Sequence, residues 1–317
     1  NEITNRRVSF YYTIIISILI IFYFRSYKSL KPLRFFVFEG MGIGFISFWV
    51  VTSLYILSLL APEFSFIFGI LSLIIIILLT LISLYYGTKL FSKEINISSE
   101  KIKINKSFVF ISDIHLGSNN SKHLIKIISI IEKYNFDFLL IGGDLIDSST
   151  VDLSALNEFK KLDCPIYFVT GNHEYYIKNS SDFIQNLSNY NIHHVSNETT
   201  LINNINLIGI NDNLSKEKQI EIINKKINNE NFNLLLIHKP SVWVNIRDKV
   251  DLMLSGHTHN GQIFPFNLFL RLLFKYKYGL HNFSNSNLYV SSGSGPWGPK
   301  MRLGTFNEII LFNLISK

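Results

Sequence analysis

Two histidines one residue apart lie near the C-terminal end of the chain, in Gly256-His257-Thr258-His259-Asn260-Gly261-Gln262. They come directly after the apolar run Leu252-Met253-Leu254, which predicts a strand. Imidazoles between glycines at the end of a strand are poorly suited to packing in a core, but they can bind a metal ion. This segment therefore indicates a metal site where a strand hands over to a loop.

Four other apolar runs, at 108–112, 138–141, 166–169 and 234–237, are also followed by side chains that can bind a metal. In α/β domains, ligands gather where strands end and loops begin. We therefore expect one active site that combines His257 and His259 with the side chains after these four runs. Those side chains are Asp113, His115, Asp144, Asn172, His173 and His238.

The types of these side chains indicate the chemistry. Carboxylate, imidazole and amide ligands without thiolate suit Mn, Fe, Zn or Co, and the single Cys164 excludes a thiolate zinc cluster. Seven ligand candidates are too many for one ion, but they fit two ions about 3.5–4 Å apart that share a carboxylate and clamp an in-line phosphoryl displacement. A water held between the ions would become hydroxide near neutral pH. The seven are Asp113, His115, Asp144, Asn172, His238, His257 and His259.

His173 directly follows a ligand candidate, in a turn that begins with glycine. It could donate a proton to the departing oxygen or stabilise the charged phosphoryl oxygens. We therefore predict that His173 is the catalytic imidazole.

Five blocks in one order carry a resemblance to a known family. They are Asp113-x-His115, Gly143-Asp144-x-x-Asp147, Gly171-Asn172-His173-Glu174, His238 and Gly256-His257-x-His259. The chain from about residue 106 to 317 resembles the calcineurin-like metallophosphoesterases. It looks most like their membrane-anchored bacterial phosphohydrolase branch, because Gly261-Gln262 extends the last block and Gly293-Ser294-Gly295-Pro296-Trp297-Gly298-Pro299 precedes Arg302-Leu303-Gly304.

The resemblance implies a four-layer αββα sandwich, a pair of mixed sheets flanked by helices, with two divalent metal ions (Mn, Fe or Zn) at one edge. It implies Asp113, His115 and His259 on one ion, Asn172, His238 and His257 on the other, and Asp144 bridging both. His173 would be oriented by Asp147, whose carboxylate fixes its tautomer. Arg302 is either a phosphate contact, since guanidinium pairs well with phosphate oxygens, or a plain surface arginine.

The N-terminal part of the 317-residue chain has a different composition from the rest. Residues 1–90 are nearly all apolar, and we expect about three transmembrane helices at 8–24, 35–60 and 64–86. The alternative for 8–24 is the core of a signal peptide, because Arg6 and Arg7 precede it. The chain begins at Asn1 rather than Met, which leaves room for a preceding segment. From residue 95 to 317, strands and helices alternate, which predicts a separate α/β catalytic domain.

The distribution of charge suggests where that domain lies. The net charge is +7, but the lysines are scattered, so we expect no nucleic acid and a lipid bilayer as partner. Arg25, Lys28, Lys31 and Arg34 lie in the first loop and Lys89 and Lys93 follow the third span, whereas 61–63 has no basic residue. The positive-inside rule then makes the chain a multi-pass membrane protein whose catalytic domain faces the cytoplasm. Arg6 and Arg7 argue the other way.

Together these features predict an enzyme that hydrolyses phosphodiester, phosphomonoester or pyrophosphate bonds by a metal-activated hydroxide. Its substrate would be a phosphorylated small molecule or, because the spans hold the site near a bilayer, a lipid such as a UDP-diacylglucosamine-type molecule or a phospholipid. Residues 264–277 alternate apolar and basic side chains, and they form either an interfacial flap or an amphipathic helix that covers the sheet. The alternatives are a protein phosphatase, a soluble-nucleotide phosphodiesterase and, least favoured, a non-catalytic membrane receptor or scaffold.

Overall fold

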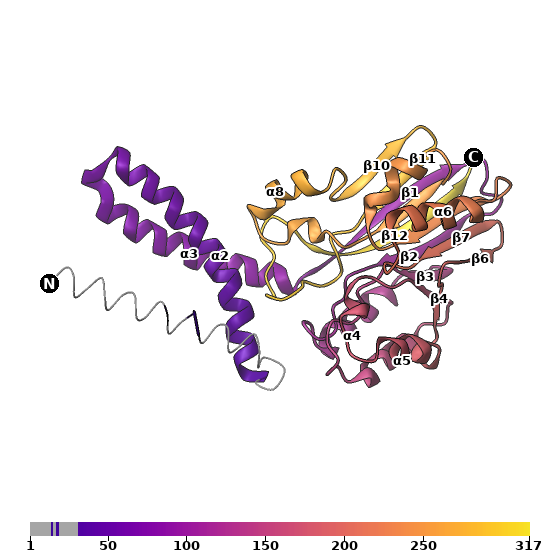
Figure 1. Ribbon diagram of the computed structural model, residues 1–317, viewed down its shortest axis with the longest axis horizontal. Coiled ribbons are helices and arrows are strands. Elements are labelled where there is room, and N and C mark those ends of the chain that lie inside the picture. The colour runs from indigo at the N-terminus through magenta and orange to yellow at the C-terminus, as the bar shows by residue number, and fades with distance from the viewer. Residues whose placement is uncertain (1–13, 15–16, 19–30) are drawn as a thin grey trace. The chain divides into compact units, whose positions relative to one another are not determined.

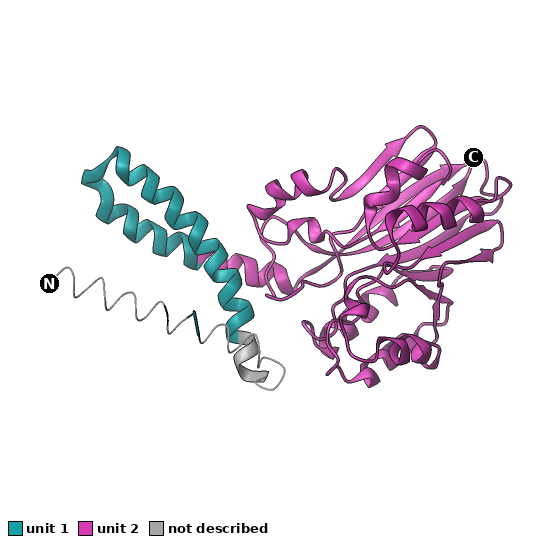
Figure 2. Ribbon diagram, in the orientation of Figure 1, with its two compact units in different colours: residues 1–77 teal, residues 78–317 magenta. Residues whose placement is uncertain are grey.

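The computed structural model describes residues 14, 17, 18 and 31–317 (Figure 1). It divides into two compact units, residues 1–77 and residues 78–317 (Figure 2). Most of the predicted span 8–24 lies outside the described residues.

Two long apolar helices dominate the first unit. Helix α2 (Lys31–Leu60) is followed by the short η1 (Pro62–Phe64) and by α3 (Ser65–Thr88), whose last turns belong to the second unit. Both helices are long and apolar enough to cross a membrane, and most of their side chains are not buried. They coincide with the predicted spans at 35–60 and 64–86.

Strand β1 (Leu90–Ser99) begins two residues after α3 ends and runs parallel to β12 (Asn307–Ser316) along its whole length. The start of the second unit is therefore paired with the C-terminal end of the chain. Strand β1 covers residues 90–95, which separate the two predicted parts of the chain, and the compact units divide between residues 77 and 78.

The second unit is built on two six-stranded sheets. The order in the first sheet is β1, β12, β2 (Lys106–Ile111), β3 (Phe138–Ile141), β4 (Ile166–Phe168) and β5 (Ile192–His194). The order in the second is β10 (Gly279–Phe283), β11 (Ser286–Val290), β9 (Leu252–Ser255), β8 (Phe232–Ile237), β7 (Ile205–Ile210) and β6 (Glu198–Ile202). Strands β2, β3 and β4 are mutually parallel, as are β7, β8 and β9, so each group ends at one edge of its sheet.

Both faces of the central strands are buried, which explains their continuous apolar runs. In β2, Phe108 and Phe110 join the core between the sheets, while Val109 and Ile111 join the core under the flanking helices. Phe108 stacks between Phe138 and Phe312 in the middle layer.

Helical segments cover the outer faces. The first sheet is covered by α4 (Ser121–Ile131), η2 (Leu153–Lys161), α5 (Ser180–Gln185) and η4 (Asn186–Tyr190). The second sheet is covered by α6 (Lys216–Lys226), η5 (Pro240–Val242) and α7 (Trp243–Ile246). The predicted four-layer αββα sandwich is confirmed, and its segment η2 is a 3₁₀ helix.

Candidate metal centre

The predicted site residues follow the C-terminal ends of strands from both sheets. Asp113 and His115 come after β2, Asp144 after β3, and Asn172 and His173 after β4. His238 comes after β8, and His257 and His259 after β9. Because these ends meet at one edge of the sandwich, residues far apart in the sequence are brought together.

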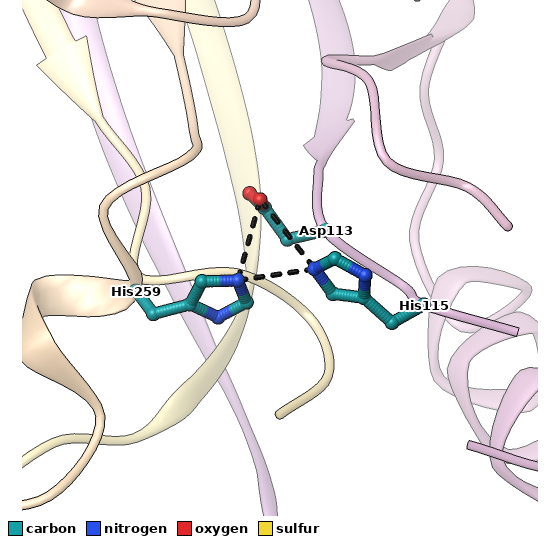
Figure 3. Close-up of side chains that lie close together, drawn as sticks. All are labelled: Asp113, His115 and His259. Atoms are coloured by element: carbon teal, nitrogen blue, oxygen red, sulfur yellow. Dashed lines mark hydrogen bonds and ion pairs between the residues drawn. The ribbon is translucent and has the colours of Figure 1, made fainter. Parts of the chain in front are cut away.

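Asp113, His115 and His259 form the group that we call the first triad (Figure 3). The Nε2 atoms of His115 and His259 are 3.1 Å apart, and Oδ1 of Asp113 lies 3.9 Å from the former and 3.5 Å from the latter. One ion could bind all three atoms.

Asp144, His238 and His257 form the second triad. Nε2 of His238 lies 3.2 Å from Oδ2 of Asp144 and 3.2 Å from Nδ1 of His257. Oδ2 of Asp144 is also 3.8 Å from Nε2 of His115, so this carboxylate lies between the triads.

Two buried atoms at the site lack a hydrogen-bond partner within the described part of the chain. Oδ1 of Asn172 and Nδ1 of His115 are buried without a hydrogen bond. A buried polar oxygen left unpaired is costly unless something else satisfies it, and a cation would do so for Asn172. The donors therefore fit two divalent ions.

The backbone around the site is strained. Asp113, His115, Asp144, His257 and His259 all have φ between 48° and 71°, in the left-handed region that non-glycine residues rarely adopt. Such conformations persist only where the surroundings enforce them, and they cluster at functional sites. This strain could not be inferred from the residue types.

Hydrogen bonds hold the ligand candidates in position. Nδ1 of His238 contacts the carbonyl oxygen of Gly142 at 2.8 Å, so Nδ1 carries the proton and Nε2 is left facing Asp144. The backbone N–H of His257 donates to both oxygens of Asp113, and that of His173 donates to Oδ1 of Asp144.

Glu174 is a site residue whose role the sequence did not reveal. Its buried carboxylate accepts hydrogen bonds from four backbone N–H groups and so fixes the loop that carries Asp144 to the turn after β4. Burial and the nearby Asp144 raise its pKa to about 8, although the backbone N–H groups of Gly171 and Ile146 oppose the shift. The only sequence signal was its place in the Gly171–Glu174 block. The four donors are the backbone N–H groups of Asp144, Leu145, Ile146 and Gly171.

Burial and the neighbouring carboxylates set the charge of the imidazoles. Burial lowers the pKa of His115 and of His257 to about 3, and that of His259 well below its usual value, so these three rings are neutral ligand candidates. Burial acts in the same direction on His238, but the carboxylates of Asp144 and Asp113 outweigh it and raise its pKa to about 10. A cation bound at Asp144 would therefore displace a proton from His238.

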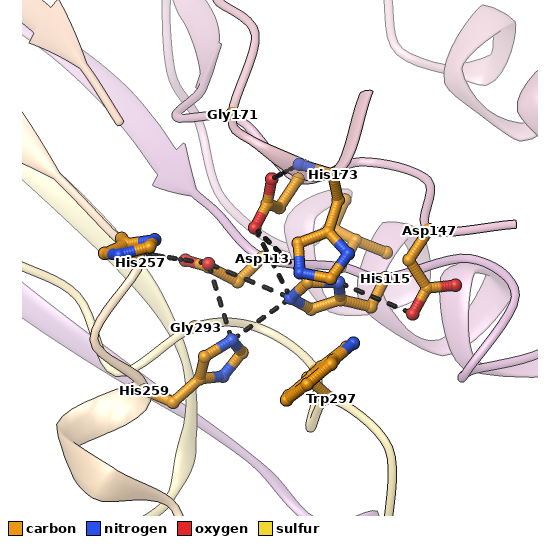
Figure 4. Close-up of polar contacts among 12 residues, drawn as sticks. Asp113, His115, Asp147, Gly171, His173, His257, His259, Gly293 and Trp297 are labelled. Carbon is orange, nitrogen blue, oxygen red and sulfur yellow. Dashed lines mark hydrogen bonds and ion pairs between the residues drawn. The ribbon is translucent and has the colours of Figure 1, made fainter. Parts of the chain in front are cut away.

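His173 lies beside His115 at the centre (Figure 4). Its ring centroid is 4.7 Å from that of His115, and its Nε2 lies 3.9 Å from Oδ2 of Asp144. Asp147 accepts hydrogen bonds from N and Oγ of Ser118, and its Oδ2 lies 3.6 Å from Nδ1 of His115. Asp147 therefore lies next to His115, a metal-ligand candidate. That Asp147 orients His173 stays a prediction.

Arg302 does not lie where a phosphate contact would require. Its side chain is fully buried behind His259, and its guanidinium donates to the carbonyl oxygens of His259, Ser292 and Gly295. Neither sequence-based interpretation, a phosphate contact or a surface arginine, describes this position. We correct both, because burial and these bonds leave no exposed donor face.

Two aromatic rings that the sequence did not single out border His173. The ring centroids of Tyr176 and Trp297 are each 5.4 Å from that of His173, and these side chains are 71% and 52% exposed. The side chain of Gln262 holds Trp297 in place through the backbone of Trp297. Oε1 of Gln262 accepts a hydrogen bond from the backbone N–H of Trp297, and Nε2 donates to the backbone carbonyl oxygen of Trp297. The Gly261-Gln262 extension thus fastens a loop beside the centre.

Residues 106–261 match the family described as calcineurin-like phosphoesterase. An uncharacterized metallophosphoesterase of Helicobacter pylori is 34% identical over 238 residues, covering 71% of this chain and 64% of that protein. One from Aquifex aeolicus is 30% identical over 222 residues, covering 65% and 84%. A Bos taurus transmembrane protein with metallophosphoesterase domain is 32% identical over 230 residues, covering 63% and 51%. The chain spans less than two thirds of the Helicobacter and Bos proteins.

Proposed function

The chain belongs to the calcineurin-like phosphoesterase family, and on this premise we propose a phosphoester hydrolase that holds two divalent metal ions in its two triads. The observation that carries the proposal is the position of Asp144 between the triads, with each triad drawing ligands from both sheets. A carboxylate shared by two ions is the arrangement that in-line phosphoryl displacement uses.

Each ion has its own set of ligand candidates. The first triad would hold one ion, the second triad together with Asn172 would hold the other, and Asp144 would contact both. When bound, Mn, Fe or Zn would supply Lewis acidity and make a water molecule acidic. The neutral imidazoles of His115, His257 and His259 are suited to binding such ions because their ring nitrogens need not first lose a proton, whereas His238 would lose one.

His173 would act on the leaving group. It is a partly exposed imidazole beside His115 and Asp144, where it would be within reach of a substrate that contacts the ions. Burial lowers its pKa, while Asp144 opposes that shift. In this position it can pass a proton to the departing oxygen or hydrogen-bond to phosphoryl oxygens.

The substrate would be lipid-linked, because an exposed apolar helix lies beside the centre. In α8 (Phe266–Leu273) only Leu270 is buried, and Leu272 and Leu273 are 84% and 70% exposed. These side chains therefore do not cover the sheet. Together with the exposed Arg271 they suit the interface of a bilayer with anionic lipids.

Contacts join α8 to the loop that carries the ligand candidates. A Cβ on Gly261 would come within 2.5 Å of the Cα of Asn267, and the ring centroid of Phe274 is 5.7 Å from that of His257. A bilayer that receives α8 would thus lie close to the second triad, where acyl-chained phosphoesters or nucleotide-linked lipids concentrate.

We extend the proposal to the location of the protein. Helices α2 and α3 would make it a multi-pass membrane protein, and the basic residues that flank them favour a catalytic unit on the cytoplasmic side. The similarity to a transmembrane protein with metallophosphoesterase domain supports the membrane location.

A second candidate function is hydrolysis of soluble nucleotide phosphodiesters. The exposed rings of Tyr176 and Trp297 beside His173 favour it, because stacking on an aromatic side chain contributes about 1–3 kcal/mol per base. A lipid linked to a nucleotide would use both these rings and α8.

The 317-residue chain in detergent, loaded with Mn²⁺, tests the two candidates. We expect hydrolysis of bis-p-nitrophenyl phosphate and a higher kcat/KM for acyl-chained diesters or pyrophosphates than for soluble nucleotide diesters. Equal values would remove the lipid preference, and preference for a phosphopeptide would favour a protein phosphatase. A chain that holds both ions but hydrolyses none of these substrates would contradict the proposed function.

A further inference from the structure

The last turns of α3, which belong to the second unit, are fastened to the loop that precedes β12. The carbonyl oxygen of Ser83 accepts the backbone N–H of Arg302 at 2.9 Å, and that of Gly87 accepts Nδ2 of Asn307 at 2.9 Å. A Cβ on Gly87 would lie 2.1 Å from the carbonyl oxygen of Lys300. The helix approaches this loop so closely that position 87 admits only glycine.

The loop that precedes β12 also contacts the first triad, through the side chain of Arg302. Nη1 of Arg302 donates to the carbonyl oxygen of His259 at 2.9 Å, and Nη2 lies 3.3 Å from Nδ1 of the same residue. Nε of Arg302 donates to Oδ1 of Asn307 at 2.9 Å. Arg302 and Asn307 are thus bonded to each other, to α3 and to a metal-ligand candidate.

These bonds act where the backbone is strained. His259 has a φ of 48°, and a hydrogen bond to its own carbonyl oxygen helps to hold that peptide in the left-handed region. Nη2 of Arg302 also donates to the carbonyl oxygen of Gly295, whose N–H donates to the carbonyl oxygen of Asp113. Arg302 therefore supports two members of the first triad and, through its backbone, the end of α3.

We propose that Arg302 and Asn307 are positioning residues that couple the end of the apolar helix α3 to the first triad. The position of the last turn of α3 then sets how His259 is presented to a metal ion. The contacts described for the second triad run instead to Gly142 and Glu174. The coupling therefore concerns only the ion in the first triad. It rests on the proposed function only because it requires that the chain bind two ions.

The chain offers a matched pair of glycines for the test. Gly87 and Gly69 both lie in α3, but a Cβ on Gly69 would meet nothing within 4 Å. Alanine favours a helix over glycine at either position, so a loss that is confined to Gly87→Ala reports the contact with the loop. Mn²⁺ binding to the 317-residue chain in detergent is measured by calorimetry, and His259→Ala and His238→Ala identify which binding step belongs to which triad.

We expect Gly87→Ala to weaken the first-triad step by about 10–100-fold, the usual effect of removing a residue that orients a metal ligand. The second-triad step should be unchanged, and Gly69→Ala should match the wild type in both. Equal binding by Gly87→Ala and Gly69→Ala would overturn the proposal.

Asn307→Asp provides a second test if Gly87→Ala does not fold. An aspartate can still accept from Nε of Arg302, but it cannot donate to Gly87 or to the carbonyl oxygen of Lys89. It should weaken the first-triad step alone, and Arg302→Lys, which keeps the charge but loses the planar fork, should do so more strongly. Unchanged first-triad binding in Asn307→Asp would contradict the coupling. A wild-type protein that binds two ions but hydrolyses no phosphoester would refute the proposed function and leave this test intact.

Discussion

The two triads have the same composition, one carboxylate and two imidazoles, yet the fold supports them differently. The second triad is held by groups close to its own strands, because His238 contacts the carbonyl oxygen of Gly142 and Glu174 fixes the loop of Asp144. The first triad depends on Arg302, which comes from a distant loop that also contacts α3. Chemically equivalent sites can therefore differ in what disturbs them.

The largest effect should come from the carboxylate that the triads share. Asp144→Asn replaces a charged ligand that lies between them, so both ions should be lost and turnover should fall to background. Metal content and hydrolysis rate are measured on the same sample. Asp137→Asn, directly before β3 and beside Lys106, is the control and should keep both ions. Two tightly bound ions in Asp144→Asn would show that the triads do not share this residue.

Removing His173 should separate catalysis from metal binding. His173→Ala should lower kcat by about 10²–10⁴-fold, the usual contribution of a general acid or base, while both triads keep their ions. His193→Ala, an exposed histidine on β5, should be silent. Undiminished turnover in His173→Ala would remove its catalytic role.

Glu174 supports the second triad as Arg302 supports the first, so its removal tests the difference between the two triads. Glu174→Ala leaves four backbone N–H donors without their acceptor, at about 1–3 kcal/mol for each that finds no new partner. Because these donors hold the loop of Asp144, binding of both ions should weaken, unlike the single step affected by Arg302→Lys. Thermal unfolding and calorimetric titration measure the two effects. Loss of only the first-triad ion would contradict this assignment.

The smallest effect should come from substitutions in α8, which leave both triads intact. Leu272→Ser with Leu273→Ser should lower kcat/KM for acyl-chained substrates by at least about tenfold, since burying even one leucine side chain contributes ~1.5–3 kcal/mol. Hydrolysis of bis-p-nitrophenyl phosphate should not change. Leu201→Ser, at a 64% exposed position on β6, is the control. An equal loss on both substrates would indicate damage to the fold instead of lost membrane contact.

The sequence predicted the layers of the fold and the members of both triads. Continuous apolar runs such as 234–237 indicated buried strands, and the ligand candidates were recognisable because they follow those runs directly. The residues that support them were harder to predict, because their partners are distant in the sequence. Glu174 contacts the loop of Asp144, and Arg302 contacts His259 across 43 residues. Hydrophobic periodicity does not reveal contacts between residues so distant in the sequence, and the residue type alone does not distinguish a buried arginine from an exposed one.

The central claim is a centre of two ions that share Asp144, and electron paramagnetic resonance of the Mn²⁺-loaded 317-residue chain tests it most directly. We expect two Mn²⁺ per chain with a spin-coupled spectrum, because ions that share a carboxylate lie about 3.5–4 Å apart. Asp144→Asn should abolish the coupled signal. A wild-type chain that binds no Mn²⁺, a single ion, or two ions without magnetic coupling would contradict the account.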